Sequence, residues 1–283
     1  MSESVHFQLP SGGWPMANKY KNIFKFSHIS KIQAFLIHLC ISAIIFIICL
    51  MLILFFWYPE QFFLYDGGWQ GVRIIVMVDM VLGPLLTLLL YKPGKRGLVI
   101  DMTFIVVAQT MALTWGIWQV YSARPVLLVF DDGQFYSLTS EQVARANPPG
   151  NDFADRSTRI AMSYLQLPGD AKEQAALGLR AYTHGQSRYM LGQYYVPLDA
   201  ERRAKVFNQA LDSELIQRKS ALVPEAHDNW ERFVEQHKDD LGDYVFFPLQ
   251  CRYGAILLYF DRHQETVLKT LNVRMPRFLF LAN

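Results

Sequence analysis

Four polar side chains lie inside stretches of sequence that are otherwise apolar, and they are the residues of this chain best placed to do chemistry. They are His38, Asp79, Asp101 and Gln109. An ionised carboxylate at the centre of a membrane helix costs roughly 2.5 to 3.5 kcal/mol on insertion scales, so such groups usually face the interior of a helix bundle and find partners there. Acids and histidines inside membranes often carry protons or ions, so a relay is one function to weigh.

Depth along the helices indicates which of these side chains meet. Counted from the same end of two antiparallel helices, Asp79 and Gln109 lie at nearly equal depth, which predicts a hydrogen bond between them. Asp101 and His38 are similarly matched nearer that end, which predicts an ionic or hydrogen-bonded pair. The two carboxylates lie at different depths and the apolar segments are few. Packing within a helix bundle is therefore favoured over a relay.

Three apolar runs carry these residues and predict three transmembrane helices. They cover residues 34–58, 74–91 and 98–121. The first has no formal charge over a length of roughly 37 Å, enough to cross a hydrocarbon core of about 30 Å with some tilt. A cleaved secretory signal is disfavoured, because the run is too long and is followed by aromatic residues rather than by a small-residue cleavage site.

The distribution of basic residues predicts the orientation. Lysines precede the first span and a Lys-Pro-Gly-Lys-Arg loop joins the second to the third, while the loop 59–73 holds one arginine and two acids. The positive-inside rule places residues 1–33 in the cytoplasm as a tail and residues 122–283 on the opposite side. In a bacterial inner (cytoplasmic) membrane that side is the periplasm. We expect residues 1–15 to be disordered, and Met16 is an alternative start.

Residues 122–283 predict an α+β domain of mixed strands and helices. A Thr139/Gln142 capping box predicts a short helix after the first strand pair. The domain is expected to form one sheet with helices on one face. Strands are predicted at 125–130, 134–138, 243–252, 255–260 and 266–273, and helices at 170–182, 198–219 and 224–238.

Signatures of enzymes, metal sites and nucleic-acid binding are missing from this domain. It holds no phosphate-binding glycine loop, no nucleophile elbow and no closely spaced cysteine and histidine cluster. Its 19 Lys and Arg against 20 Asp and Glu argue against nucleic acid as a partner. We expect no catalytic residue, cofactor or metal. Scattered surface or core histidines are expected at His184, His227, His237 and His263.

The second and third spans carry an unusual pattern. The motif Asp-x-x-x-Gly-Pro-Leu-x-Thr runs from Asp79, its Gly83-Pro84 step predicts a kink, and an Ala-Arg124-Pro step follows the third span. With the basic loop between the spans, Asp101, Gln109 and Gly116, this pattern resembles the type IV pilin accessory protein family (TfpX/TfpY/TfpZ-type, FimB-like). The resemblance covers residues 31 to 136.

The resemblance implies an inner-membrane protein without enzymatic activity that binds a cognate major pilin and modulates pilus assembly, retraction and twitching motility. Assembly-platform proteins and membrane lipids are further partners that it implies. Gly83 and Gly116 would let a pilin stem approach closely, and Arg124 would cap a helix, bind lipid phosphate or order the first strand. The residues expected to organise the membrane module or contact a partner are Asp79, Gly83, Pro84, Asp101, Gln109, Gly116, Arg124 and His38.

Two other classes of function remain open at this point. A membrane-anchored sensor would bind a ligand in the periplasm, but it would need a partner for its output because the cytoplasmic segments are short. A pilin-modifying enzyme would need an acidic motif on an external loop and typically more spans.

Overall fold

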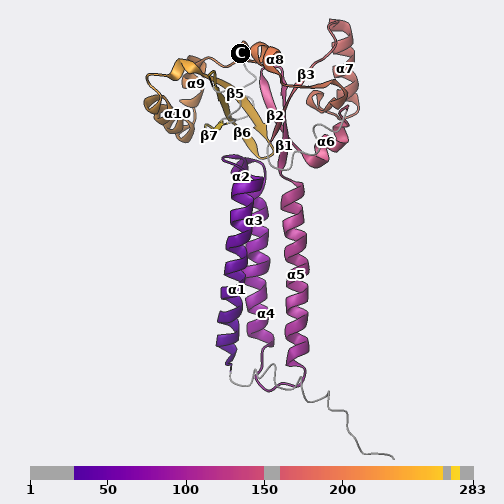
Figure 1. Ribbon diagram of the computed structural model, residues 1–283, viewed down its shortest axis with the longest axis vertical. Coiled ribbons are helices and arrows are strands. Elements are labelled where there is room, and N and C mark those ends of the chain that lie inside the picture. The colour runs from indigo at the N-terminus through magenta and orange to yellow at the C-terminus, as the bar shows by residue number, and fades with distance from the viewer. Residues whose placement is uncertain (1–28, 150–159, 264–268, 275–283) are drawn as a thin grey trace, which may run out of the picture.

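The computed structural model describes residues 29–149, 160–263 and 269–274. Three long helices run side by side as a stalk, and a domain of mixed helices and strands sits on one end of it (Figure 1). The predicted disorder of residues 1–15 and the alternative start at Met16 lie outside the described residues.

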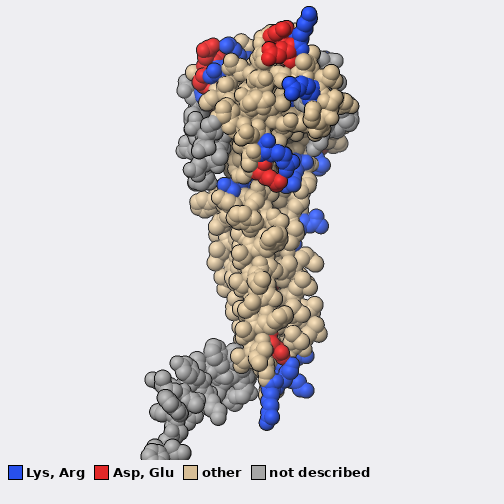
Figure 2. Space-filling view, turned by 90° about the vertical axis from the view of Figure 1, so that its right-hand side faces the viewer, with Lys and Arg blue, Asp and Glu red and all other residues tan. Residues whose placement is uncertain are grey.

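Each stalk helix is long and apolar enough to cross a membrane. The lengths are 27 residues for Lys31–Trp57, 23 for Gly68–Leu90 and 25 for Leu98–Ser122. On the face that Figure 2 shows, the shaft of the stalk is almost free of charged residues, which gather on the domain and at the stalk's far end. The bounds of the elements are α1 Lys31–Leu52 with a π-helical turn Ile53–Trp57, α2 Phe62–Tyr65, α3 Gly68–Val76 with a π-helical turn Met77–Leu82, α4 Gly83–Leu90 and α5 Leu98–Ser122.

The second stalk helix begins at Gly68, whereas the apolar run predicted a start at residue 74. Its added turns contain polar residues that the run excluded, but they also bury Val72 against the rest of the molecule. Gly71 lets α3 approach α5 closely, because a Cβ atom at this position would lie 2.2 Å from a methyl group of Val120. Packing therefore extends the helix beyond its apolar segment.

The C-terminal domain follows directly from α5. Thr139 and Gln142 form the predicted capping box at the start of α6. The strands are β1 Pro125–Asp131, β2 Gln134–Thr139, β3 Ala161–Leu165, β4 Tyr195–Pro197, β5 Tyr244–Cys251, β6 Gly254–Asp261 and β7 Lys269–Leu271. The helices are α6 Ser140–Ala146, α7 Ala171–Thr183, α8 Ala200–Phe207, α9 Ser213–Ser220 and α10 Pro224–Gln236.

The strands form one mixed sheet in the order β4-β3-β1-β2-β5-β6-β7. The hairpins β1–β2 and β5–β6 are antiparallel and meet through the parallel pair β2–β5. β3 runs parallel to β1, and the short strands β4 and β7 pair antiparallel at the two edges. The predicted strand 266–273 is observed only as β7, and its residues 266–268 lie outside the described residues.

Helices cover both faces of the sheet, so the expectation that they lie on one face was wrong. Alternate residues of a strand point to opposite faces. Phe247 packs with Phe207 of α8 and with Tyr58 and Phe62 from the end of the stalk, whereas Phe246 packs with Trp230 of α10. A third cluster fixes α6 and the residues around 190 against β1.

The predicted helix 198–219 is divided into α8 and α9. The chain leaves the helix after α8 so that Leu211 can donate its N–H to the carbonyl of Phe246, at 2.8 Å, and Asp212 then caps α9. This break carries the chain from one face of the sheet to the other. The strands β3 and β4 were not predicted, since each is short and β4 follows two turns of 3₁₀-helix.

Candidate functional site

The first group of candidate residues forms a polar contact in the middle of the stalk. The amide of Gln109 donates to the Asp79 carboxylate at 3.2 Å and to the Asp79 carbonyl at 3.3 Å, as the depth match predicted. Asp79 is 4% exposed. A hydrogen bond to a buried acid links two helices inside an apolar bundle, and it holds α5 against the second stalk helix.

His38 pairs with Thr87 rather than with Asp101. The Nδ1 atom of His38 lies 2.5 Å from the Thr87 hydroxyl, and that hydroxyl donates to the carbonyl of Gly83 at 3.2 Å. A hydroxyl has a single proton, so the direction of the His38–Thr87 bond depends on the tautomer of the imidazole. This contact fixes α1 to α4.

The predicted pair of Asp101 and His38 is therefore not formed. Asp101 forms an ion pair with Lys95 in the loop just before α5. α1 packs against α4, so His38 meets Thr87 instead. Equal depth predicts a contact only between helices that pack against each other, as those of Asp79 and Gln109 do.

Gly83 and Pro84 shape the second stalk helix around Asp79. The N–H of Gly83 donates to the carbonyl of Val78, a π-helical bond that widens the turn before Pro84, whose ring nitrogen has no proton. A Cβ atom on Gly83 would lie 1.9 Å from the Gln109 amide nitrogen. The glycine therefore makes room for the Gln109 contact.

Both candidate glycines pack inside the bundle. Gly83 is buried against Gln109, and a Cβ atom on Gly116 would lie 3.4 Å from Ile75. They were expected to offer a close approach to a partner's helix, and in the structure their near neighbours are the stalk's own helices.

Arg124 lies where α5 ends and the domain begins. Its guanidinium donates to the carbonyl of Tyr121 at 2.8 Å, and its Cζ atom stands 3.6 Å from the centre of the Tyr121 ring. It thereby satisfies a carbonyl of the last helical turn and covers an aromatic face, which combines a C-terminal cap with a cation–π contact.

A second polar group, which the sequence did not predict as a site, joins the domain to the stalk. Asp66 follows α2 and is 4% exposed. Its carboxylate accepts hydrogen bonds from the Ser137 hydroxyl at 2.5 Å and from the Arg252 backbone N–H at 2.8 Å. Burial raises the pKa of Asp66, while these two bonds and a bond from the Cys251 thiol oppose the rise. We call residues 58–67 the junction segment.

Further hydrogen bonds connect the junction segment to α5 and to the sheet of the domain. The Tyr58 hydroxyl donates to the carbonyl of Val120 at 2.9 Å, and Tyr65 accepts at its carbonyl from the Tyr253 N–H at 2.8 Å. Glu60 accepts from the N–H and hydroxyl of Thr270 on β7. The junction segment thus binds α5, the β5–β6 turn and the edge strand of the sheet.

The sequence held one signal for this junction. The acid follows a run of aromatic residues and precedes two glycines, Tyr65-Asp66-Gly67-Gly68, and the first of these has φ of +108°. An acid at a turn that only glycine adopts easily indicates a specific structure rather than a solvated loop. The positive-inside rule uses Asp66 only as one charge of its loop, and so it does not predict that Asp66 links the domain to the stalk.

The described residues hold no group of three or more histidine, cysteine or acidic side chains that could bind a metal ion. Three histidines of the domain lie near separate acids, His227 near Glu231, His237 near Asp240 and His263 near Asp243, while His184 contacts the carbonyl of Arg180. Together, the polar contacts of the stalk fix its three helices to one another, and those of the junction segment fix the folded domain to their end.

About a third of the chain is similar in sequence to fimbrial assembly proteins of Dichelobacter nodosus. The fimbrial assembly protein of serogroups C1 and C2 is 35% identical over 97 residues, which are 34% of this chain and 74% of that relative. The fimbrial assembly proteins of serogroup E1 and serogroup I are also 35% identical over 97 residues, and the match spans 38% of the length of each. No family model and no solved structure matches the chain.

Proposed function

The chain belongs to the family of the fimbrial assembly proteins, and from this membership we propose that it is an accessory protein of type IV pilus biogenesis that binds a cognate major pilin. Membership of the family is the observation that carries the proposal. The proposed role is not enzymatic: the protein would modulate the balance of pilus assembly and retraction, and thereby twitching motility, through contacts with the pilin and with proteins of the assembly platform.

The proposed location is the bacterial inner membrane, with the N-terminus in the cytoplasm and the C-terminal domain in the periplasm. Three helices of suitable length and apolarity support insertion, and the basic residues at the end of the stalk away from the domain support this orientation (Figure 2).

The junction segment supports a role that depends on a fixed geometry. A pilus subunit waiting in the membrane offers one surface in the bilayer and another outside it. This chain offers the same two kinds of surface, and Asp66, Glu60 and Tyr65 hold them in one relative orientation. A subunit held by both would be presented to the assembly machinery in a defined pose.

Deletion of the gene tests the proposal. Surface pili and twitching should be lost in the deletion strain, and pili should return when the retraction motor is also removed, because assembly then has no opposing process. The full-length protein should also co-purify with the pilin from crosslinked membranes. Normal pili in both backgrounds would refute the proposal.

A further inference from the structure

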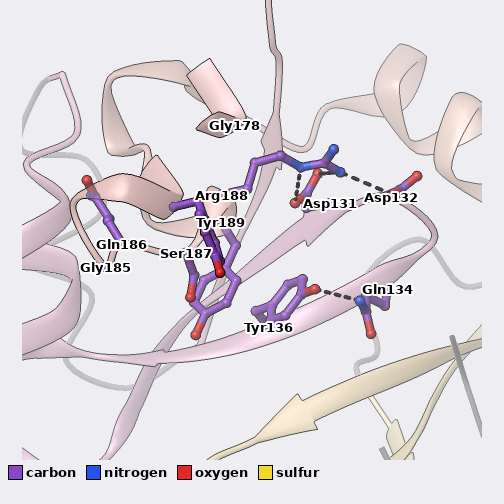
Figure 3. A pocket seen from close by; sticks show the side chains of 11 residues that line it. Asp131, Asp132, Gln134, Tyr136, Gly178, Gly185, Gln186, Ser187, Arg188 and Tyr189 are labelled. Carbon is purple, nitrogen blue, oxygen red and sulfur yellow. Dashed lines mark hydrogen bonds and ion pairs between the residues drawn. The ribbon is translucent and has the colours of Figure 1, made fainter. Parts of the chain in front are cut away.

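A cavity of about 650 Å³ opens on the C-terminal domain between the β1–β2 hairpin and the segment that follows α7 (Figure 3). This volume lies within the range of roughly 300 to 1,000 Å³ of pockets that bind small ligands or side chains. Tyr136 and Tyr189 lie side by side along it, with ring centroids 4.0 Å apart, and Arg188 reaches across to the hairpin (Figure 3).

The ionisable groups that line the cavity include one more negative charge than positive charge. Arg188 donates to both oxygens of Asp131, at 2.9 and 2.6 Å, which is a two-point ion pair. Asp132 lies 3.4 Å from the same guanidinium nitrogen that Asp131 already engages, and its side chain is 81% exposed. The two acids and one arginine that line the cavity therefore carry a net charge of −1, centred on Asp132.

Neutral groups at both ends of the cavity are suited to a donor-rich ligand, with Gln134 at the Asp132 end and Gln186 at the opposite end (Figure 3). The amide nitrogens of Gln134 and Gln186 already donate, to the Tyr136 hydroxyl and to the Met190 carbonyl. Within the described part of the chain the amide oxygens of these two glutamines accept no hydrogen bond, so both oxygens remain as acceptors. Tyrosine rings attract cations through their negative faces.

We propose that this cavity binds a lysine or arginine side chain presented by a partner protein. The cation would meet the Asp132 carboxylate at the end of the cavity where the Gln134 amide also lies, with the tyrosine rings beside it (Figure 3). A saccharide would also use amides and rings, but the uncompensated charge favours a cation. The inference deepens the proposed function and rests on it for the partner's identity, which would be the pilin head.

The exposed apolar side chains of the helix beside the cavity indicate that the cation belongs to a protein partner rather than to a free small amine. None of the α7 side chains whose burial is described is buried, and the helix extends away from the body of the domain (Figure 1). It exposes Leu179 by 64% and Tyr182 by 82%, and Tyr182 also lines the cavity. A partner that places a cation in the cavity would cover this apolar surface.

Small probes test the chemistry on the full-length protein in detergent. Nα-acetyl-lysine amide and Nα-acetyl-arginine amide should give saturation-transfer NMR signals that fall about fivefold in Asp132→Asn, because the charge-assisted bond is lost. Asn tolerates the left-handed backbone of this position, where φ is +51°, so the turn is kept. The matched control is Asp228→Asn on the exposed surface of α10, which should change nothing.

Three results would overturn the inference: an equal signal from uncharged acetyl-norleucine amide, no effect of Asp132→Asn, or binding of an N-acetylglucosamine trimer alone. A photo-crosslinking amino acid at Gln186, on the rim, then tests the partner in cells. It should capture the pilin, and Asp132→Asn should abolish the adduct. Pilin that co-purifies without this adduct would refute the inference and leave the proposed function standing. Cation binding without any co-purified pilin would refute the function instead.

Discussion

Truncation of the buried acid at the junction, Asp66→Ala, should loosen the domain from the stalk. The substitution leaves the Arg252 N–H and the Ser137 hydroxyl without their acceptor. Loss of a hydrogen bond to a carboxylate at this partly buried contact costs about 1 to 3 kcal/mol for each donor. Burial of the Asp66 carboxylate is itself unfavourable, as its raised pKa indicates, so removing this group offsets part of the loss in free energy. We expect a net loss of about 2 to 4 kcal/mol in the free energy of opening this contact.

Hydrogen exchange measures this loss directly. Protection of the Arg252 and Tyr253 amides in the full-length protein should fall at least about 30-fold, since 1.4 kcal/mol is a tenfold change. Asp66→Asn keeps an acceptor oxygen for the Arg252 N–H and should lose much less. Asp228→Ala, at an exposed position, is the control for truncation of an acid. Unchanged amide protection in Asp66→Ala, or equal losses in Ala and Asn, would refute the reasoning.

The raised pKa of Asp66 also gives the contact a pH dependence with a defined sign. The folded state binds this proton more tightly than the unfolded state. Stability from this group therefore increases as the pH falls through the raised pKa, and it is lost as the pH rises. The melting temperature of the wild type minus that of Asp66→Asn should increase on mild acidification. A difference that is flat with pH, or that decreases, would contradict the sign.

Substitutions at three further positions test the stalk and the domain. Gly83→Ala should push the amide of Gln109 from Asp79 and lower the amount of protein in membranes, as measured by immunoblot, whereas an unchanged amount would show that the helices adjust freely. Asp79→Asn should keep piliation because it keeps a hydrogen bond, while Asp79→Leu should lower protein abundance; loss of function in Asn at normal abundance would instead indicate a proton relay. Arg188→Ala should lower the melting temperature by an amount corresponding to about 3 kcal/mol, because it leaves Asp131 nearly buried and unpaired; no change would mean that water replaces the guanidinium.

The features that follow from local pattern could be predicted from the sequence. The three apolar runs, the β1–β2 hairpin around its Asp-Asp-Gly turn and the capping box at Thr139 are each determined by residues close together in the chain. The hydrogen bond of Asp79 and Gln109 was predictable because adjacent antiparallel helices bring equal depths together.

The features that depend on distant contacts could not be predicted in the same way. The break between α8 and α9 is determined by a backbone bond to Phe246, and the early start of α3 by packing on Val120. Asp66 acquires its role only when Ser137 and Arg252, far away in the sequence, fold against it. The Tyr65-Asp66-Gly67-Gly68 motif indicates a specific turn, but no local period or motif encodes which distant residues meet it.

The polar residues of the stalk form separate contacts rather than a chain. Asp79 meets an amide, His38 meets a hydroxyl, and Asp101 meets a lysine in the loop before α5. A relay needs successive groups that can each receive and pass on a proton, and an amide between helices does neither at neutral pH. Each contact instead joins two segments at one place, as Asp66 does between stalk and domain. The buried polar groups thus serve to fix geometry, which is the property that the proposed presentation of a pilin subunit requires.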